Sequence, residues 1–85
     1  MKRMKCSCCD FYTFTRDDLI ADICPVCFWQ YDIVAQKYPT ISIGPNHGIS
    51  LIQARENYQK YGVYDKQFKS RVRQPLLEEL PENNC

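Results

Sequence analysis

The hydrophobic and polar positions in the first third of the chain predict a β-hairpin. Residues 11–15 (FYTFT) are aromatic or β-branched, which favours a strand. Residues 16–18 (RDD) are typical of a turn, and residues 19–23 (LIADI) are again mostly apolar. The three segments therefore predict two short strands joined by a tight turn.

The pattern changes to that of an amphipathic helix after residue 49. Apolar side chains recur at spacings of three and four along residues 51–61. Ser50 and Gln53 fit a capping box, and Gly62 stands where helices commonly end in the left-handed conformation. The sequence therefore predicts a helix over 51–61, followed by a shorter one that Asp65 would cap.

Four of the six cysteines form two pairs with the spacing of a metal site. Two residues separate Cys6 from Cys9 and Cys24 from Cys27, and fourteen residues lie between the pairs. A tight turn between paired cysteines presents two sulfurs to one ion, and zinc takes four such ligands in a tetrahedron. The spacing therefore predicts one structural zinc ion with no open position for water, so that binding energy becomes folding energy.

Other cysteine chemistry remains open at this point. Four thiolates also suit iron, as in rubredoxin-like electron carriers. Cys24 and Cys27 have the spacing of a redox disulfide, and the cysteines can also pair as structural disulfides. Cys8 lies inside the first pair, where we expect a small packed thiol, and Cys85 is terminal.

These elements together predict an α+β fold. We expect a small rubredoxin-like zinc ribbon, with two knuckles on a β-hairpin and C-terminal helices packed against it. The chain of 85 residues is predicted to be a single domain, 1–85. Within it, 6–30 would be the ribbon, 50–73 the helical part and 81–85 a flexible tail.

Charge and composition narrow the classes of function. The net charge is only +1, but residues 51–73 carry six Lys or Arg side chains against two carboxylates, a net charge of +4. This segment and the aromatic pair after Cys27 supply the candidate partner contacts: Trp29, Arg55, Lys66, Lys69 and Arg71. A solvated helix face explains the basic segment equally well, the aromatic pair can instead cover the metal site with apolar surface, and Arg55 can clamp a loop to the helix. The start shows no secretory signal, and no stretch approaches the roughly 20 apolar residues of a membrane span, so we expect a cytoplasmic protein with no membrane partner.

Several separated motifs resemble one known family. The residues concerned are Cys6-Ser7-Cys8-Cys9, Asp22-Ile23-Cys24-Pro25-Val26-Cys27-Phe28-Trp29, Gly44-Pro45-Asn46 and Leu51-Ile52-Gln53-Ala54-Arg55-Glu56-Asn57-Tyr58. Together they resemble the cysteine-rich CPCC family of small bacterial proteins, over about residues 6 to 75. Ser7 stands where the family's motif has proline, and the resemblance implies that a third cysteine in the first pair, here Cys8, belongs to the family pattern.

These observations favour a zinc-stabilised protein-interaction module without enzymatic activity. An immunity-type or adaptor protein of a bacterial system would be one form of it. The alternative is a nucleic-acid-binding zinc ribbon, supported by basic residues interleaved with tyrosines, and a rubredoxin-like electron carrier is third. The chain has one histidine and no Gly-rich phosphate loop, which argues against an enzyme.

Overall fold

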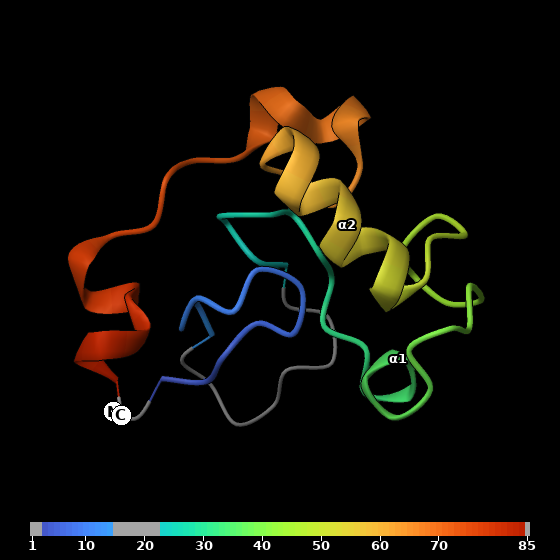
Figure 1. Ribbon diagram of the computed structural model, residues 1–85, viewed down its shortest axis with the longest axis horizontal. Helices are drawn as coiled ribbons and strands as arrows, with labels where there is room; N and C mark the ends of the chain where they lie inside the picture. The colour runs from blue at the N-terminus through green and yellow to red at the C-terminus, as the bar shows by residue number, and fades with distance from the viewer. Residues whose placement is uncertain (1–2, 15–22, 85) are drawn as a thin grey trace.

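The computed structural model describes residues 3–14 and 23–84, with two cysteine loops at the centre (Figure 1). We call residues 6–10 the first knuckle and residues 24–28 the second knuckle. The helical elements of the described residues are α1 (Ile33–Lys37), α2 (Leu51–Tyr61), and the short 3-10 helices η1 (Lys66–Arg71), η2 (Leu77–Glu79) and η3 (Pro81–Asn83).

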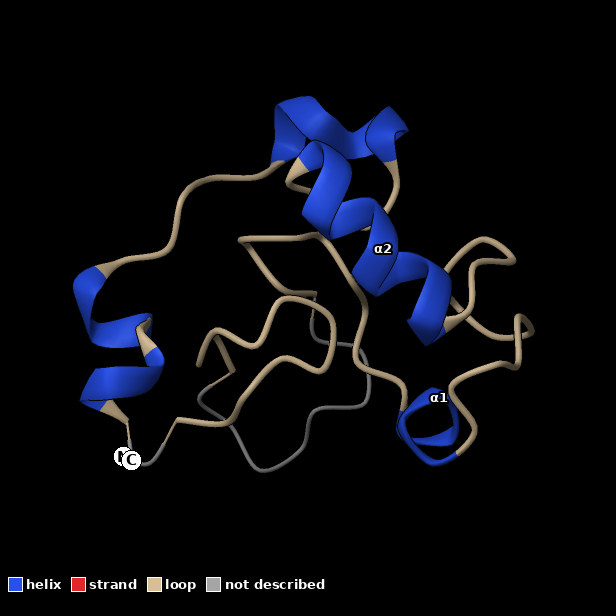
Figure 2. Cartoon of the chain, in the orientation of Figure 1, coloured by secondary structure: helices blue, strands red, loops and turns tan. Residues whose placement is uncertain are grey.

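The predicted hairpin is wrong, and with it the α+β zinc-ribbon class. The described residues form helices and loops but no strand (Figure 2), and their β-pairing is limited to isolated bridges between Met4 and Phe14 and between Ile23 and Gln30. Each bridge closes one cysteine loop upon itself. The first predicted strand, as far as Phe14, therefore pairs with the chain just before its own knuckle. The predicted turn at 16–18 and residues 19–22 of the second predicted strand lie outside the described residues.

The two knuckles have the same backbone conformation and hydrogen bonding. The amide of Asp10 donates to the carbonyl of Cys6 at 2.9 Å, and the amide of Phe28 donates to the carbonyl of Cys24 at 2.8 Å. Asp10 and Phe28 both have positive φ, 68° and 70°. For a bulky residue such as Phe28 this left-handed conformation costs about 1 kcal/mol or more, which the packing around it must offset.

The predicted helix over 51–61 is confirmed as α2. The Ser50 hydroxyl accepts the amide of Gln53 at 3.1 Å, and Gly62 ends the helix with φ 75°. The second half of the capping box is absent, since the Gln53 side chain donates to Asn57 at 2.9 Å. Ala54 is fully buried, so α2 packs this face against the knuckles.

The core is built around the cysteines. The buried cluster contains five of them together with Phe14, Trp29, Ala35, Leu51, Ala54 and Tyr64. Such a cluster is small, and a chain of this length buries too little apolar surface for a large margin of stability. The cysteine centre is therefore where additional stability has to come from.

A polar framework attaches α1 and the loop after it to the second knuckle. Asp32 caps α1 by accepting two amides of its first turn, at 3.0 and 3.3 Å. Gly44, with φ 128°, lies so close that an added Cβ would stand 2.8 Å from Oδ2 of Asp32. The buried Asn46 then accepts the amide of Gln30 at 2.8 Å and donates to its carbonyl at 3.0 Å. The Gly-Pro-Asn motif thus fixes the path of this loop.

Within residues 3–14 and 23–84, no helix has the length and apolar character that crossing a membrane demands.

Candidate metal centre

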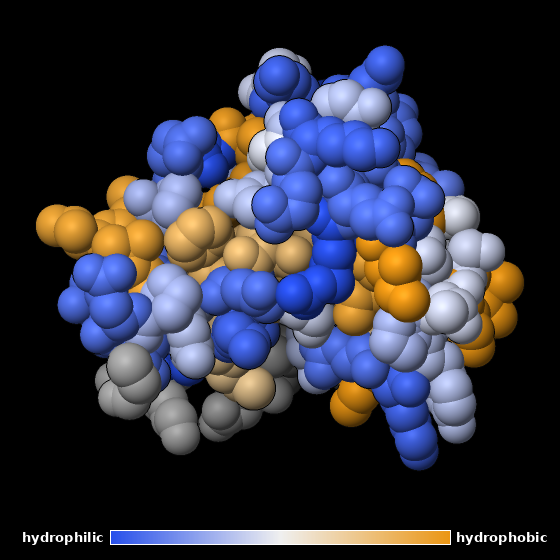
Figure 3. Space-filling model, viewed as in Figure 1, coloured by the Kyte–Doolittle hydropathy of each residue, from blue (hydrophilic) through white to orange (hydrophobic). Residues whose placement is uncertain are grey.

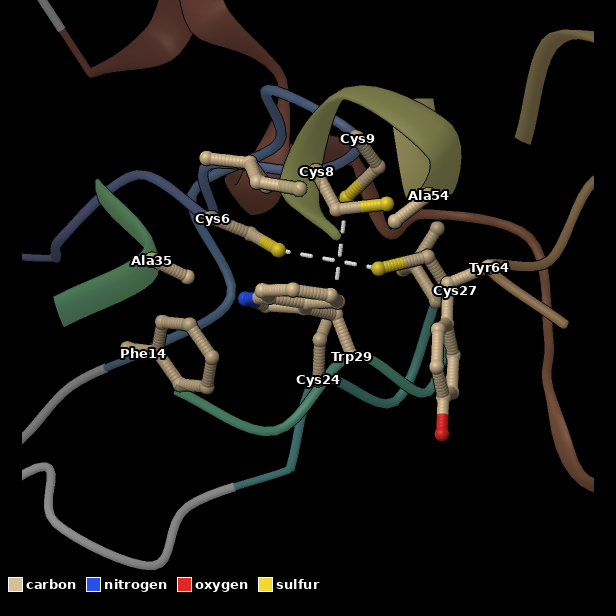
Figure 4. Packing of buried hydrophobic residues seen from close by; sticks show 12 residues of the cluster. Cys6, Cys8, Cys9, Phe14, Cys24, Cys27, Trp29, Ala35, Ala54 and Tyr64 are labelled. Atoms are coloured by element: carbon tan, nitrogen blue, oxygen red, sulfur yellow. Dashed lines mark hydrogen bonds between the residues drawn. The ribbon is translucent and has the colours of Figure 1, made fainter. Parts of the chain in front are cut away.

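The structure brings the four paired cysteines together in one buried group. Sγ of Cys6 lies 3.6 Å from Sγ of Cys27, and Sγ of Cys9 lies 3.7 Å from Sγ of Cys24. All four sulfurs lie within 4.8 Å of one another. In Figure 4 the side chains of Cys6, Cys9 and Cys27 point to a common centre, with Trp29 against it.

These separations suit a tetrahedral metal ion. Four sulfurs at about 2.3 Å from one zinc ion stand about 3.8 Å apart, close to the two shortest distances observed. Each knuckle supplies two of the four sulfurs, and the two closest sulfur pairs join one knuckle to the other. Cys6, Cys24 and Cys27 are fully buried and Cys9 is 8% exposed, so the four side chains are almost completely shielded from solvent.

The same distances argue against disulfides at this centre. A disulfide bond is about 2.05 Å long, and the sulfur pairs are separated by far more. All four cysteines are free, as is Cys8. The closest sulfurs also belong to different pairs, which disfavours a redox disulfide between Cys24 and Cys27.

The pKa values of three of these thiols depart from their ordinary range. Hydrogen bonds from Cys27 and Cys6 hold the pKa of Cys24 well below its usual range. Burial raises the pKa of Cys27, and the hydrogen bond with Cys24 raises that of Cys9. A bound cation would stabilise thiolates at all four positions.

Thr13 adds a hydrogen bond that the sequence did not reveal. Its hydroxyl donates to Sγ of Cys24 at 3.1 Å. Hydrogen bonds to ligating atoms orient them and stabilise their charge. Thr13 was read only as a strand residue, and its position beside the sulfur follows from the fold of the first knuckle.

Cys8 is buried but lies outside the four-sulfur group. It is 3% exposed and belongs to the same cluster as Ala54, toward which its side chain points in Figure 4. The expectation of a small packed thiol agrees with this position. His47 is also outside the group, and its Nδ1 lies 2.9 Å from the hydroxyl of Tyr64.

Trp29 does not have the exposure that the proposed partner contact requires. It is 1% exposed and stacks edge-on against Tyr64, with ring centroids 5.7 Å apart. Burial raises the pKa of Tyr64 to about 12, so its phenol stays protonated at neutral pH. Trp29 therefore belongs to the buried cluster around the four cysteines.

Arg55 has a structural partner of its own. Its guanidinium donates to the carbonyl of Ser7 and, at 3.1 Å, to Oδ2 of Asp10. The first knuckle is thereby tied to α2. The Ser7 hydroxyl also donates to the side chain of Gln36 in α1, at 2.8 Å, which links the same knuckle to α1.

The remaining candidate contacts lie on η1. Lys66, Lys69 and Arg71 are exposed. The ammonium of Lys66 stands 5.7 Å from the ring centroid of Tyr61, at the C-terminal end of α2. All three belong to η1, which lies beside the C-terminal end of α2, whereas α1 lies near the other end of α2 (Figure 1).

The fold and site define a small helical domain organised around a four-cysteine centre that can hold one metal ion. The chain matches the family described as Cysteine-rich CPCC over residues 4–79, and it belongs to that family. The predicted resemblance is thus confirmed. No significant match was found among curated proteins or among solved structures.

Proposed function

We propose that this chain is a zinc-stabilised, non-enzymatic module that binds another protein. The observation that carries the proposal is the closed four-thiol centre, with its sulfurs within 4.8 Å of one another and almost no exposure. Catalytic zinc sites keep a position for water or substrate, whereas a buried set of four thiolates fills every position. A metal held in this way supplies stability and shape.

Zinc is proposed over iron because a structural role needs no redox chemistry. The test is the metal content and absorption spectrum of protein purified from cells supplied with both metals. One zinc per chain and a colourless solution are expected. A red protein containing iron would replace this proposal with the electron carrier.

The low exposure of most tyrosine rings near the basic segment favours a protein partner over nucleic acid. Binding of single strands relies on exposed rings on which bases stack. Tyr64 is 1% exposed and packs against Phe68, and Tyr58 is half-buried in an edge contact with Phe11. Tyr61, at 39% exposure, is the ring among these tyrosines that remains accessible.

The protein-binding role is tested with the products of neighbouring genes, co-expressed with the zinc-loaded chain. A stoichiometric complex should elute from size-exclusion chromatography at the summed mass. The matched control is Cys24→Ser, which should lose both metal and complex. A complex that survives loss of the metal, or the absence of complexes with all neighbouring products, would contradict the proposal.

A further inference from the structure

A pocket opens where the end of α2 meets the second knuckle. Its volume is about 340 Å³. Tyr58 and Tyr61 of α2 and Val72 provide apolar surface, and Lys69 of η1 contributes an ammonium group. Val26 of the knuckle also lines the pocket but is itself 1% exposed. This size lies at the lower end of ligand pockets, which suits one or two amino-acid side chains better than a large cofactor.

The walls of the pocket are tied to the metal centre. The amide of Arg73 donates to the carbonyl of Pro25 at 3.1 Å, and the amide of Tyr64 donates to the carbonyl of Cys27 at 2.9 Å. Both carbonyls belong to the second knuckle. The segments before and after η1 are therefore hydrogen-bonded to the second knuckle, and these bonds hold the walls of the pocket in place without a ligand.

The charge of the pocket comes from one lysine. Arg73 also lines it, but its guanidinium makes a two-point ion pair with Glu79, at 2.8 and 2.9 Å. Among the described residues, no carboxylate lies within ion-pair distance of Lys69. The pocket thus presents an unneutralised cation beside apolar and phenolic surface.

The surroundings reinforce this positive charge. Lys66 stands over the ring of Tyr61, and Lys60 and Arg71 are exposed near the same end of α2. Figure 3 shows a mainly hydrophilic surface over η1 and the C-terminal half of α2. A small apolar pocket with a basic rim is complementary to an acidic segment that also carries apolar side chains.

We propose that this pocket receives an acidic side chain and its apolar neighbour from a partner protein. The carboxylate faces Lys69, and the apolar neighbour packs on Tyr58 and Val72. This inference rests on the proposed protein-binding function, and it assigns the partner contact to this pocket instead of to Trp29.

The test uses the full-length, zinc-loaded protein and two blocked pentapeptides, acetyl-Leu-Glu-Tyr-Glu-Leu-amide and its Gln counterpart. Amide signals are followed by two-dimensional NMR during titration. The acidic peptide should shift the signals of Gly62, Lys69 and Val72, and it should bind about five times more tightly than the neutral one. Equal binding of the two peptides, or shifts confined to other parts of the chain, overturns the proposal.

Two lysine variants provide the matched comparison. Lys69→Gln removes the pocket cation, and Lys37→Gln removes an exposed lysine of α1 that lies 5.9 Å from the ring of Tyr38. Lys69→Gln should reduce binding of the acidic peptide to the level of the neutral peptide, whereas Lys37→Gln should bind like the wild type. Equal effects of both variants would mean that general charge, and not the pocket, is responsible.

Failure of this inference can be separated from failure of the proposed function. A partner protein that binds wild type and Lys69→Gln equally well overturns the pocket and leaves the protein-binding function standing. Conversely, the peptides can bind as expected while no protein complex forms. That outcome supports the pocket's preference for acidic ligands and counts against the proposed protein-binding function.

Discussion

Cys8 occupies in the first knuckle the place that Val26 occupies in the second. Each is the residue directly before the second cysteine of its pair, and each is buried, at 3% and 1% exposure. The backbone hydrogen bonds around the two loops correspond as well, because Cys6 and Cys24 accept from the residue four positions later in both. The third cysteine therefore takes the role of a small apolar side chain.

This correspondence predicts that Cys8→Val folds and keeps its metal. The change replaces a small buried thiol by a slightly larger apolar group, and the free energy of unfolding should change by about 1.5 kcal/mol or less. Zinc stoichiometry and thermal unfolding measure the two effects.

Cys24→Ser is the contrasting variant, since it removes a metal ligand. It should lose the metal and remain unfolded at neutral pH. If Cys8→Val also lost its metal, Cys8 would have to be a ligand, contrary to its position outside the four-sulfur group.

Removal of the metal from the wild type is expected to unfold the domain. Structural zinc contributes about 10–16 kcal/mol in small zinc domains, which exceeds the total stability of most domains of this size. The buried Trp29 is the only tryptophan, so its fluorescence reports the change directly. Chelator titration should give a red-shifted emission and loss of helical circular dichroism together, and added zinc should restore both.

An apo protein with unchanged emission and helicity would contradict this expectation. The control is Cys8→Val, which retains all four ligands and should respond to the chelator as the wild type does.

The four cysteines of the candidate metal centre could be predicted from the sequence because the geometry they need is local. A pair of cysteines two residues apart in a tight turn presents both sulfurs to one ion, whatever the rest of the chain does. The helix over 51–61 was predictable for a similar reason. Ser50 and Gly62 mark its ends through contacts with residues at most four positions away.

The hairpin was mispredicted because strand propensity does not show which other segment an extended segment pairs with. The residues up to Phe14 favour an extended chain, but Phe14 pairs with Met4, on the other side of the first knuckle, and not with a second strand. The contact of Arg55 with Asp10 joins residues 45 positions apart, which no local pattern contains. Strand pairing and long-range ion pairs depend on the whole fold and therefore need the structure.

The sequence pattern does not predict α1, for a different reason. The helix has only five residues, too few for an apolar period to be visible. Its cap, Asp32, is held against Gly44, and this contact becomes apparent only when the loop is placed.

Gly44→Ala is expected to destabilise α1. The φ of 128° is unfavourable for any residue with a Cβ, and the new methyl group would stand 2.8 Å from Oδ2 of the capping Asp32. Strain and loss of the cap should together cost about 2–3 kcal/mol. Thermal unfolding gives the total, and amide exchange in α1 shows whether the helix frays.

Gly48→Ala is the matched control. Gly48 also has positive φ, 78°, but an added Cβ meets nothing within 4 Å. It should therefore cost only the conformational penalty, about 1 kcal/mol, and leave amide exchange in α1 unchanged. Equal losses in both variants would mean that the contact with Asp32 contributes nothing.

Glu79→Gln should destabilise the domain at neutral pH. Glu79 is 3% exposed, and its carboxylate accepts from Arg73 and from the amide of Leu76, at 2.9 Å. The hydrogen bond with Arg73 is the main reason that the pKa of Glu79 lies below its ordinary value. The amide keeps one acceptor but loses the charge, so the expected loss is about 1–2 kcal/mol.

The lowered pKa of Glu79 determines how its contribution to the free energy of unfolding depends on pH. A carboxyl with a lowered folded-state pKa contributes stability that is complete above its unfolded pKa, near 4.5, and is lost as the pH falls through the folded value. The difference in unfolding free energy between wild type and Glu79→Gln should therefore be constant from about pH 6 to 8. Metal release at lower pH affects both proteins, so carboxyl NMR is used there to follow Glu79 itself. A Glu79 carboxyl that titrates at or above its ordinary pKa would show that the pair with Arg73 does not stabilise the charged form.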